Sequence, residues 1–115
     1  MQARAVARYV RYSPRKLRRH ADLIRGKHLQ EVRAILGLAS SPAAKAVRKV
    51  VESAAANAEN NYDMKPEDLY LTDITVDDGF TFRGGWRPRA RGRADRRRRR
   101  TSHITVVLDD EVAQV

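Results

Sequence analysis

The sequence predicts an α+β fold in which three helices accompany β-strands and a long, arginine-rich hairpin projects from the body. Three observations carry this prediction. Residues 3–10 alternate with a period of two, which is typical of a short strand. Residues 13–61 hold three apolar stripes with helical spacing, and the first and third follow a start signal. Two segments rich in β-branched and aromatic residues, 69–76 and 104–108, flank the arginines, and such residues favour strands.

Capping signals mark the starts of the first and third helices, and an apolar stripe marks the second. The first is expected to begin at Ser13 and Pro14 and to stop at Gly26, because serine caps a helix, proline suits its first position and glycine favours its end. Its buried stripe is Leu17, Ala21 and Ile24. The second helix spans about 30–39, with Val32, Ile35, Leu36 and Ala39 facing inward. The third opens at Ser41 and Pro42 and ends near 60–61, and its inner face consists of Ala43, Val47, Val50, Val51, Ala54 and Ala58.

Charge is distributed unevenly along the chain. Its 115 residues include 24 basic and 14 acidic side chains, with a net charge of +10 and a pI near 10.8. Ten arginines and one acid, Asp95, give residues 83–100 a charge of +9, and seven basic residues without an acid give residues 1–19 a charge of +7. The remainder carries −6. A mildly acidic body with two basic surfaces is typical of a protein that binds a polyanion.

The stretch between the two strand segments predicts an extended arm. A floppy loop is the alternative, but structureless loops beyond about 12–15 residues are uncommon in compact domains. We therefore expect the strands to continue outward and to turn near Arg91 and Gly92, where glycine permits a positive φ. An extended strand from Tyr70 to Arg91 would span roughly 65–70 Å. The chain is then a single domain, 1–115, with a body at 1–79 and 101–115 and an arm at about 80–100.

The choice of arginine indicates RNA as the polyanion. All ten cations within residues 83–100 are arginine, which grips phosphates in bidentate fashion and stacks on bases, whereas lysine supplies mainly a point charge. Arginine-rich segments that become ordered on binding recognise RNA, and the chain lacks the signatures of helix-turn-helix, zinc-finger or basic-zipper DNA binders. A targeting signal or a merely solvated run is the alternative, and the position between two strands disfavours it.

Two further features fit RNA binding. The first helix carries cations on its outer side with no acid nearby to pair with them, although a solvated surface would look the same. The only tryptophan, Trp86, lies among the arginines instead of in the core, where it could stack on a base.

Several other classes of protein are excluded or disfavoured. Without cysteine there are no disulfides or thiolate metal sites, and no apolar run approaches the roughly 20 residues of a membrane span. The first residues lack the apolar block of a signal peptide, so a cytoplasmic protein without a cofactor is expected. Ser102 and His103 are adjacent on a strand and point to opposite faces, which argues against a nucleophile and its base. His20 and His28 are interpreted as surface residues, and Asp77-Asp78-Gly79 as a strand irregularity instead of a calcium loop.

Particular motifs also resemble a known family. RYSPRKLR near the start, DLIRGK, the SAAANAENN helix, PRARGRAD and RTSHITVV are similar, in this order and over roughly residues 3–108, to the bacterial large-subunit ribosomal protein twenty-two family. PRARGRA and RTSHITV are highly specific. The resemblance implies three helices packed on a small antiparallel three-stranded sheet, with a long protruding β-hairpin. It also implies a non-enzymatic structural and assembly protein of the ribosome.

In that family the hairpin runs through large-subunit ribosomal RNA, and its tip lines the nascent-chain exit tunnel, where macrolide-resistance changes map. The implied partners are 23S rRNA, neighbouring ribosomal proteins at the tunnel and the nascent polypeptide, with no membrane and no homo-oligomer. The implied tip is Arg89, Ala90, Arg91, Gly92 and Arg93. Together with the arginine argument, the resemblance predicts an RNA interface of Ser13, Arg15, Lys16, Arg18, Arg19, Arg83, Trp86, Arg87, Arg89, Arg91, Arg93, Arg96, Arg97, Arg98, Arg99, Arg100, Thr101, Ser102 and His103.

Two segments depart from the family pattern. Residues 96–100 are all arginine where the family has a mixed run, and FTFRGGWR, residues 80–87, replaces a shorter and more lysine-rich segment. A free RNA-binding regulator with a disordered arginine-rich arm is the alternative function, and an enzyme is a distant third because no pocket chemistry is visible in the sequence.

Overall fold

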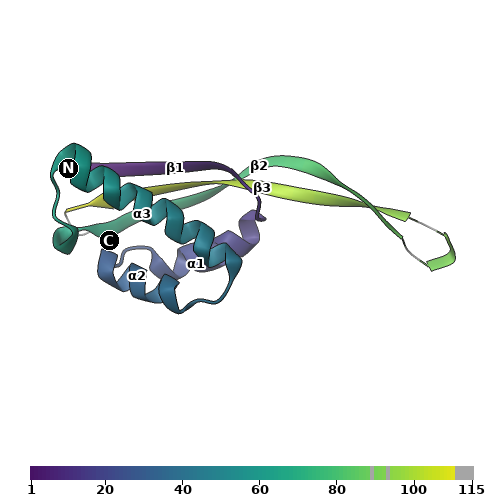
Figure 1. Ribbon diagram of the computed structural model, residues 1–115, viewed down its shortest axis with the longest axis horizontal. Helices are drawn as coiled ribbons and strands as arrows, with labels where there is room; N and C mark the ends of the chain where they lie inside the picture. The colour runs from purple at the N-terminus through teal and green to yellow at the C-terminus, as the bar shows by residue number, and fades with distance from the viewer. Residues whose placement is uncertain (89, 93, 111–115) are drawn as a thin grey trace.

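The structure is a computed structural model that describes residues 1–88, 90–92 and 94–110, with the backbone alone described at 82–88, 90 and 94–98. The order of elements is β1 (Gln2–Val10), α1 (Pro14–Ile24), α2 (Leu29–Leu38), α3 (Pro42–Tyr62), a short 3₁₀ turn (Pro66–Asp68), β2 (Tyr70–Pro88), a second 3₁₀ turn (Ala90–Gly92) and β3 (Ala94–Asp109). Figure 1 shows a body of helices on a sheet, from which β2 and β3 continue as a long ribbon. The predicted fold class is confirmed.

The helices lie where the capping signals placed them. Pro14 and Pro42 occupy the first turns of α1 and α3, and the predicted stripes of both helices are fully or almost fully buried. In α2, Val32 and Leu36 are buried, whereas Ile35 and Ala39 are only partly so. Ile35 and Ala39 still pack against the core, so the predicted inward face of this short helix is confirmed, with these two residues at its margin.

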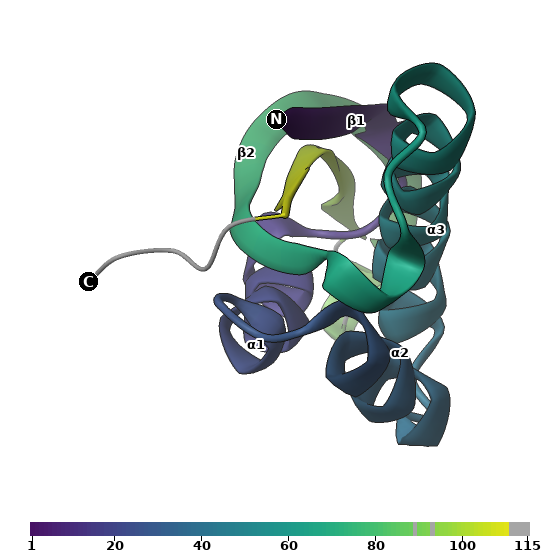
Figure 2. The same ribbon diagram turned by 90° about the vertical axis from the view of Figure 1, so that its left-hand side faces the viewer.

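The sheet has three antiparallel strands in the order β1-β3-β2, so the C-terminal strand lies in the middle. Figure 2 shows the helices on one side of the sheet, with α3 beside β1 and α1 and α2 below. Alternate residues of the central strand, Ile104, Val106 and Leu108, are fully buried under them. The alanines of α3, including Ala54, Ala55 and Ala58, are also buried, because small side chains let the helix approach the sheet closely.

Both edges of the sheet receive side-chain or loop hydrogen bonds. Arg18 donates to the Val76 carbonyl from Nε (3.2 Å) and Nη2 (2.8 Å), and Arg25 Nη2 donates to the Ile74 carbonyl (2.8 Å). On the other edge, Asn57 Nδ2 donates to the Arg4 carbonyl (3.0 Å). Exposed strand edges invite pairing with other chains. These contacts occupy edge carbonyls of β2 and β1 within the molecule.

The connection between α1 and α2 also follows the β2 edge. Gly26 N–H donates to the Leu71 carbonyl (2.8 Å), Leu71 N–H donates to the Lys27 carbonyl (2.8 Å), and Leu29 N–H donates to the Leu69 carbonyl (3.0 Å). Gly26 makes this possible because it adopts a φ of 81°, which glycine reaches without steric cost. The predicted helix stop at this residue is confirmed.

The arm begins where β1 stops pairing with the sheet. The last β1 pair is Val10 with Ser102, and beyond it β2 and β3 pair only with each other, from Thr81–Arg100 to Pro88–Ala94. The ribbon prediction is therefore confirmed over the loop alternative. The longest dimension of the molecule is 60 Å, less than the predicted 65–70 Å for one strand alone, because twist and three register shifts in the β2–β3 ladder shorten the path. The radius of gyration, 17.0 Å, exceeds the roughly 13 Å of a compact domain of this length.

Candidate nucleic-acid interface

Along the arm, the strand register brings arginine positions opposite one another. Arg83 pairs with Arg98 across the ribbon, and the neighbouring pairs are Phe82 with Arg99 and Thr81 with Arg100. Like charges directly opposite destabilise a strand pair, and two-stranded ribbons are marginal in water even without this repulsion. Among the described pairs of the arm, Arg87 alone lies opposite an acid, Asp95. We therefore expect external anions to stabilise the arm.

At the far end of the arm, the chain reverses over Ala90–Gly92. Gly92 has a φ of 71°, as predicted, and Arg91 also adopts a positive φ of 60°. The prediction missed the second of these, since arginine seldom occupies the left-handed region. Nothing lies within 4 Å of a Cβ built on Gly92, so the backbone angle alone selects glycine there. The predicted tip residues Arg89 and Arg93 lie outside the described residues.

Thr101 and Ser102 lie at the base of the arm and have structural roles. Thr101 is 1% exposed and Ser102 is 0% exposed. The Thr101 hydroxyl donates to the Phe80 carbonyl (2.5 Å), and the Ser102 hydroxyl donates to the Tyr12 carbonyl (2.7 Å). Burial and these bonds give both side chains partners within the protein, and their predicted contact with RNA stays a prediction. They hold together the strands from which the arm emerges.

His103 forms a small cluster with Tyr9 on the neighbouring strand. Tyr9 N–H donates to His103 Nδ1 (3.2 Å), and the two rings meet edge to face with centroids 5.0 Å apart. Tyr9 has a φ of 58° and is 60% exposed, within the register shift of β1. Ser102 and His103 thus have different partners, which confirms that they are not a catalytic pair. No local pattern predicts the unusual backbone of Tyr9.

The outer face of α1 carries the second basic surface. Arg15, Lys16 and Arg19 are exposed there, and Arg18, also exposed, is the one that binds the Val76 carbonyl. Ser13 is the N-cap residue, as predicted, but its side chain makes no capping bond. This leaves the half-buried hydroxyl at the start of a basic helix, where anions are favoured.

His28, interpreted from the sequence as a surface residue, is half-buried and also makes structural contacts. It is the N-cap of α2: its Nδ1 accepts from Gln30 N–H (3.2 Å), while Nε2 lies 2.5 Å from the Glu67 carbonyl. Its ring also meets Tyr70 edge to face at 5.0 Å. His20 is partly buried. Within the described ranges, no three acids or histidines are grouped so as to hold a metal ion.

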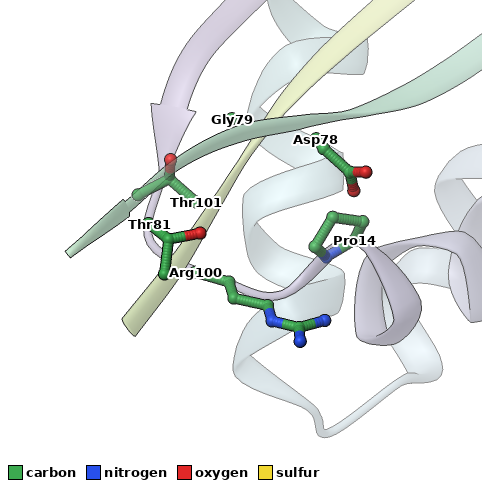
Figure 3. A pocket seen from close by; sticks show the side chains of 6 residues that line it. All are labelled: Pro14, Asp78, Gly79, Thr81, Arg100 and Thr101. Carbon is green, nitrogen blue, oxygen red and sulfur yellow. The ribbon is translucent and has the colours of Figure 1, made fainter. Parts of the chain in front are cut away.

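The predicted irregularity at Asp77-Asp78-Gly79 is confirmed and has a packing cause. The β2–β3 register shifts between Asp78 and Thr81. A Cβ on Gly79 would lie 2.5 Å from Thr101 Oγ1 and 3.1 Å from its carbonyl carbon, so only glycine permits this approach. Beside it lies a hollow of about 300 Å³, shown in Figure 3. It is lined by Pro14, Asp78, Gly79, Thr81, Arg100 and Thr101.

Comparisons with known proteins agree with this arrangement. Residues 5–109 match the family described as ribosomal protein L22p/L17e. The chain belongs to this family. The large ribosomal subunit protein uL22 of Pelotomaculum thermopropionicum is 55% identical over 111 residues, which cover 96% of this chain and 97% of the relative. The uL22 proteins of Thermus thermophilus, 54% identical with the same coverage, and of Roseiflexus sp., 52% identical over 96% of both chains, are also similar. The family predicted from the motifs is confirmed.

Among the helices that the structure describes, none is long and apolar enough to cross a membrane.

Proposed function

We propose that this chain is a structural, rRNA-binding constituent of the large ribosomal subunit. In this proposal its arm passes through large-subunit rRNA, aids assembly and lines the nascent-chain exit tunnel with its tip. Membership of the L22p/L17e family supports the coarse role, which is non-enzymatic and belongs to the cytoplasmic ribosome. The single observation that carries the finer role is the ladder that continues from Thr81–Arg100 to Pro88–Ala94 through an arginine-rich sequence.

Without RNA, the folded arm is energetically unfavourable. A two-stranded ribbon with arginines opposite one another is repelled by its own charge, and that repulsion ends when phosphates lie between and around the guanidinium groups. Folded rRNA supplies phosphates on several sides of a narrow channel, whereas an isolated duplex presents them on one side only. A ribbon that projects from a body 25 Å across can therefore be surrounded by RNA while the body remains at the surface.

The proposed contacts divide into two groups. The first is the arm, 80–100, of a single domain whose body is 1–79 and 101–115. The second is the α1 surface formed by Ser13, Arg15, Lys16 and Arg19, with Arg18 at its margin. The proposed tip, residues 89–93, faces the nascent polypeptide, and neighbouring ribosomal proteins and 23S rRNA are the other partners. His103 is proposed as a contact at the base, with Thr101 and Ser102 acting through the backbone that they fix.

Sedimentation tests this role. A tagged chain expressed in bacterial cells should sediment with the large subunit and remain there through a high-salt wash, because the threaded arm cannot dissociate without unfolding rRNA. A chain that lacks residues 80–100 should incorporate less efficiently and wash off at lower salt. If the full-length chain leaves the particle in the wash, or binds only free RNA, it is instead the regulator considered as the alternative.

A further inference from the structure

We infer that the hollow at the base of the arm is a binding site for the base of one unpaired guanosine in the bound rRNA. The inference rests on the proposed function for its RNA, and it adds a position, a chemical identity and a mode of recognition that the arginine content does not imply. The hollow lies where α1, β2 and β3 meet, between the two basic surfaces.

The walls of the hollow are held in place by the contacts of the arm base. Gly79 and Thr101 are in such close contact that no larger residue fits at position 79, and the Thr101 hydroxyl binds the Phe80 carbonyl. The Pro14 ring is buried at the start of α1. Because these parts are fixed by packing within the protein, the hollow is present before any ligand arrives.

The hollow has a volume suited to a single base. At about 300 Å³ it lies at the lower end of the range for small-molecule sites, and it is too small for a base pair or a helix. Pro14, although mostly buried, lines the hollow and gives a planar ring an apolar edge to contact. An unpaired nucleotide can present its base to such a site, which is the usual way in which proteins read RNA sequence.

The hollow is lined by two groups of opposite charge that suit different parts of a nucleotide. Asp78 and Arg100 both line the hollow and are exposed, and Figure 3 shows their charged groups on two sides of the Pro14 ring. Within the described part of the chain, neither side chain has an ion pair or a hydrogen bond. Arg100 suits a phosphate, as the rest of the arm does. Asp78 repels phosphate, so it indicates that a base, with its N–H donors, lies on that side.

Among the four RNA bases, guanine matches a carboxylate best. Its Watson–Crick edge carries two adjacent donors, N1–H and the N2 amino group, which fit the two oxygens of a carboxylate that accepts only. Adenine and cytosine each offer one amino donor beside an acceptor nitrogen, which would face carboxylate lone pairs. Uracil offers one N–H between two carbonyl groups. The Thr81 hydroxyl, on the wall of the same hollow, can donate or accept and supplies a further polar contact.

The experiment measures binding of the full-length protein to short single-stranded RNAs of equal length. Each RNA is uridine-rich and differs only at one central position, which is guanosine, adenosine, cytidine, uridine or inosine. Electrostatic attraction is the same for all five, so any difference reports on the base. The guanosine RNA should bind about tenfold more tightly than the adenosine, cytidine and uridine RNAs, the discrimination that one bidentate base contact gives. Inosine, without the N2 amino group, should fall in between.

Asp78→Asn should abolish this preference, because an amide replaces one acceptor by a donor, while overall affinity should rise slightly with the loss of a negative charge. The matched control is Asp77→Asn, which makes the same charge change at an exposed neighbour that does not line the hollow. It should raise affinity for all five RNAs and keep the guanosine preference. Circular dichroism of each variant verifies that the body is folded.

Three outcomes would overturn the inference. Equal affinity of the unmodified protein for all five RNAs removes the guanine site but leaves general RNA binding, and the sedimentation result, unaffected. A guanosine preference that survives Asp78→Asn shows that the base binds elsewhere. Guanosine monophosphate should displace the guanosine RNA only in large excess, because it lacks the neighbouring phosphates. Displacement at equal concentration would identify a free nucleotide as the ligand and overturn the assignment to RNA.

Discussion

Strands β2 and β3 run through both the body and the arm, but the side chains they carry change where β1 ends. In the body, Leu71, Ile74 and Val76 lie in register with Leu108, Val106 and Ile104, and all six are buried. In the arm, the corresponding positions include Thr81, Phe82 and Arg83 opposite three arginines. The β2–β3 hydrogen-bond ladder thus runs through two regions that differ in what stabilises them.

The difference shows that strand pairing alone does not stabilise a region. In the body, burial of apolar side chains under α1 and α3 opposes the loss of conformational entropy. In the arm no helix covers the ribbon (Figure 1), and the charges repel. We therefore expect the body to fold by itself and the arm to reach its full stability only with a polyanion. Five predictions test this comparison.

The largest expected difference is in hydrogen exchange. In the isolated protein, amides of 71–76 and 104–108 should exchange only through global unfolding, while the paired amides of 81–88 and 94–100 should exchange orders of magnitude faster, through local opening. Addition of rRNA fragments should slow the second group. Equal protection of both groups without RNA, measured by mass spectrometry, would contradict the division into body and arm.

A large effect on binding is expected from replacing Arg96–Arg100 with glutamine. In a plot of log affinity against log salt concentration, the slope should become less steep by about 0.7 to 0.9 for each phosphate no longer neutralised. The midpoint of urea unfolding of the body should not change. The control is glutamine at Lys27 and Lys65, exposed cations of the body, which should change the slope much less per charge removed. A slope unaffected by the arginine substitutions would mean that they face solvent.

A side chain at Gly79 should destabilise the junction of arm and body. Gly79→Ala places a Cβ 2.5 Å from Thr101 Oγ1 and 3.1 Å from backbone atoms, so we expect a loss of about 1–3 kcal/mol, as for overpacking elsewhere. Gly37→Ala, within α2 and with nothing within 4 Å, should be neutral or stabilise by about 0.5–1 kcal/mol. Thermal unfolding distinguishes the two. Similar effects would show that the strands separate readily at residue 79.

Substitution of Gly26 or Gly92 would introduce similar backbone strain, in the body and in the arm respectively. Their φ values are 81° and 71°, and an added Cβ meets nothing within 4 Å at either position. Valine at each should cost about 1–3 kcal/mol locally. Because Gly26 is tied to Leu71 of the body sheet, Gly26→Val should lower the free energy of global unfolding, whereas Gly92→Val should not. In cells, Gly92→Val should leave incorporation largely intact and alter macrolide sensitivity. Loss of incorporation without a tunnel phenotype would contradict the placement of the tip.

The smallest effect is expected from the ion pair between α2 and α3. Arg33 Nε and Nη2 bind the two oxygens of Glu52 at 2.9 and 3.0 Å, with side chains 37% and 41% exposed. The hydrogen bond to Glu52 raises the pKa of Arg33 above its ordinary value. A raised pKa means that this stabilisation is complete below the ordinary pKa and is lost only in strong alkali, so Arg33 itself adds no pH dependence near neutrality. Arg33→Met should cost at most about 1 kcal/mol, less at high salt. A larger loss in urea unfolding would indicate a packing role.

The sequence by itself determined the parts that depend on neighbouring residues. Ser13-Pro14 and Ser41-Pro42 set the starts of α1 and α3, and the spacing of residues such as Leu17, Ala21 and Ile24 set the buried faces. The arginine run, too long for a loop and flanked by strand segments, predicted a ribbon that turns at Gly92. The motifs predicted the family. Each of these features follows from steric preferences or periodicity among residues close together in the sequence.

The tertiary structure alone decided what depends on residues far apart in sequence. His28 becomes a helix cap with Glu67 as a second partner, Arg18 and Arg25 bind carbonyls of β2, and Gly79 is required by Thr101. Asp78 and Arg100 line one hollow with Pro14 only after three elements pack. No local pattern identifies such partners, because a side chain's hydrogen bonds and burial depend on which distant backbone groups the fold brings within reach.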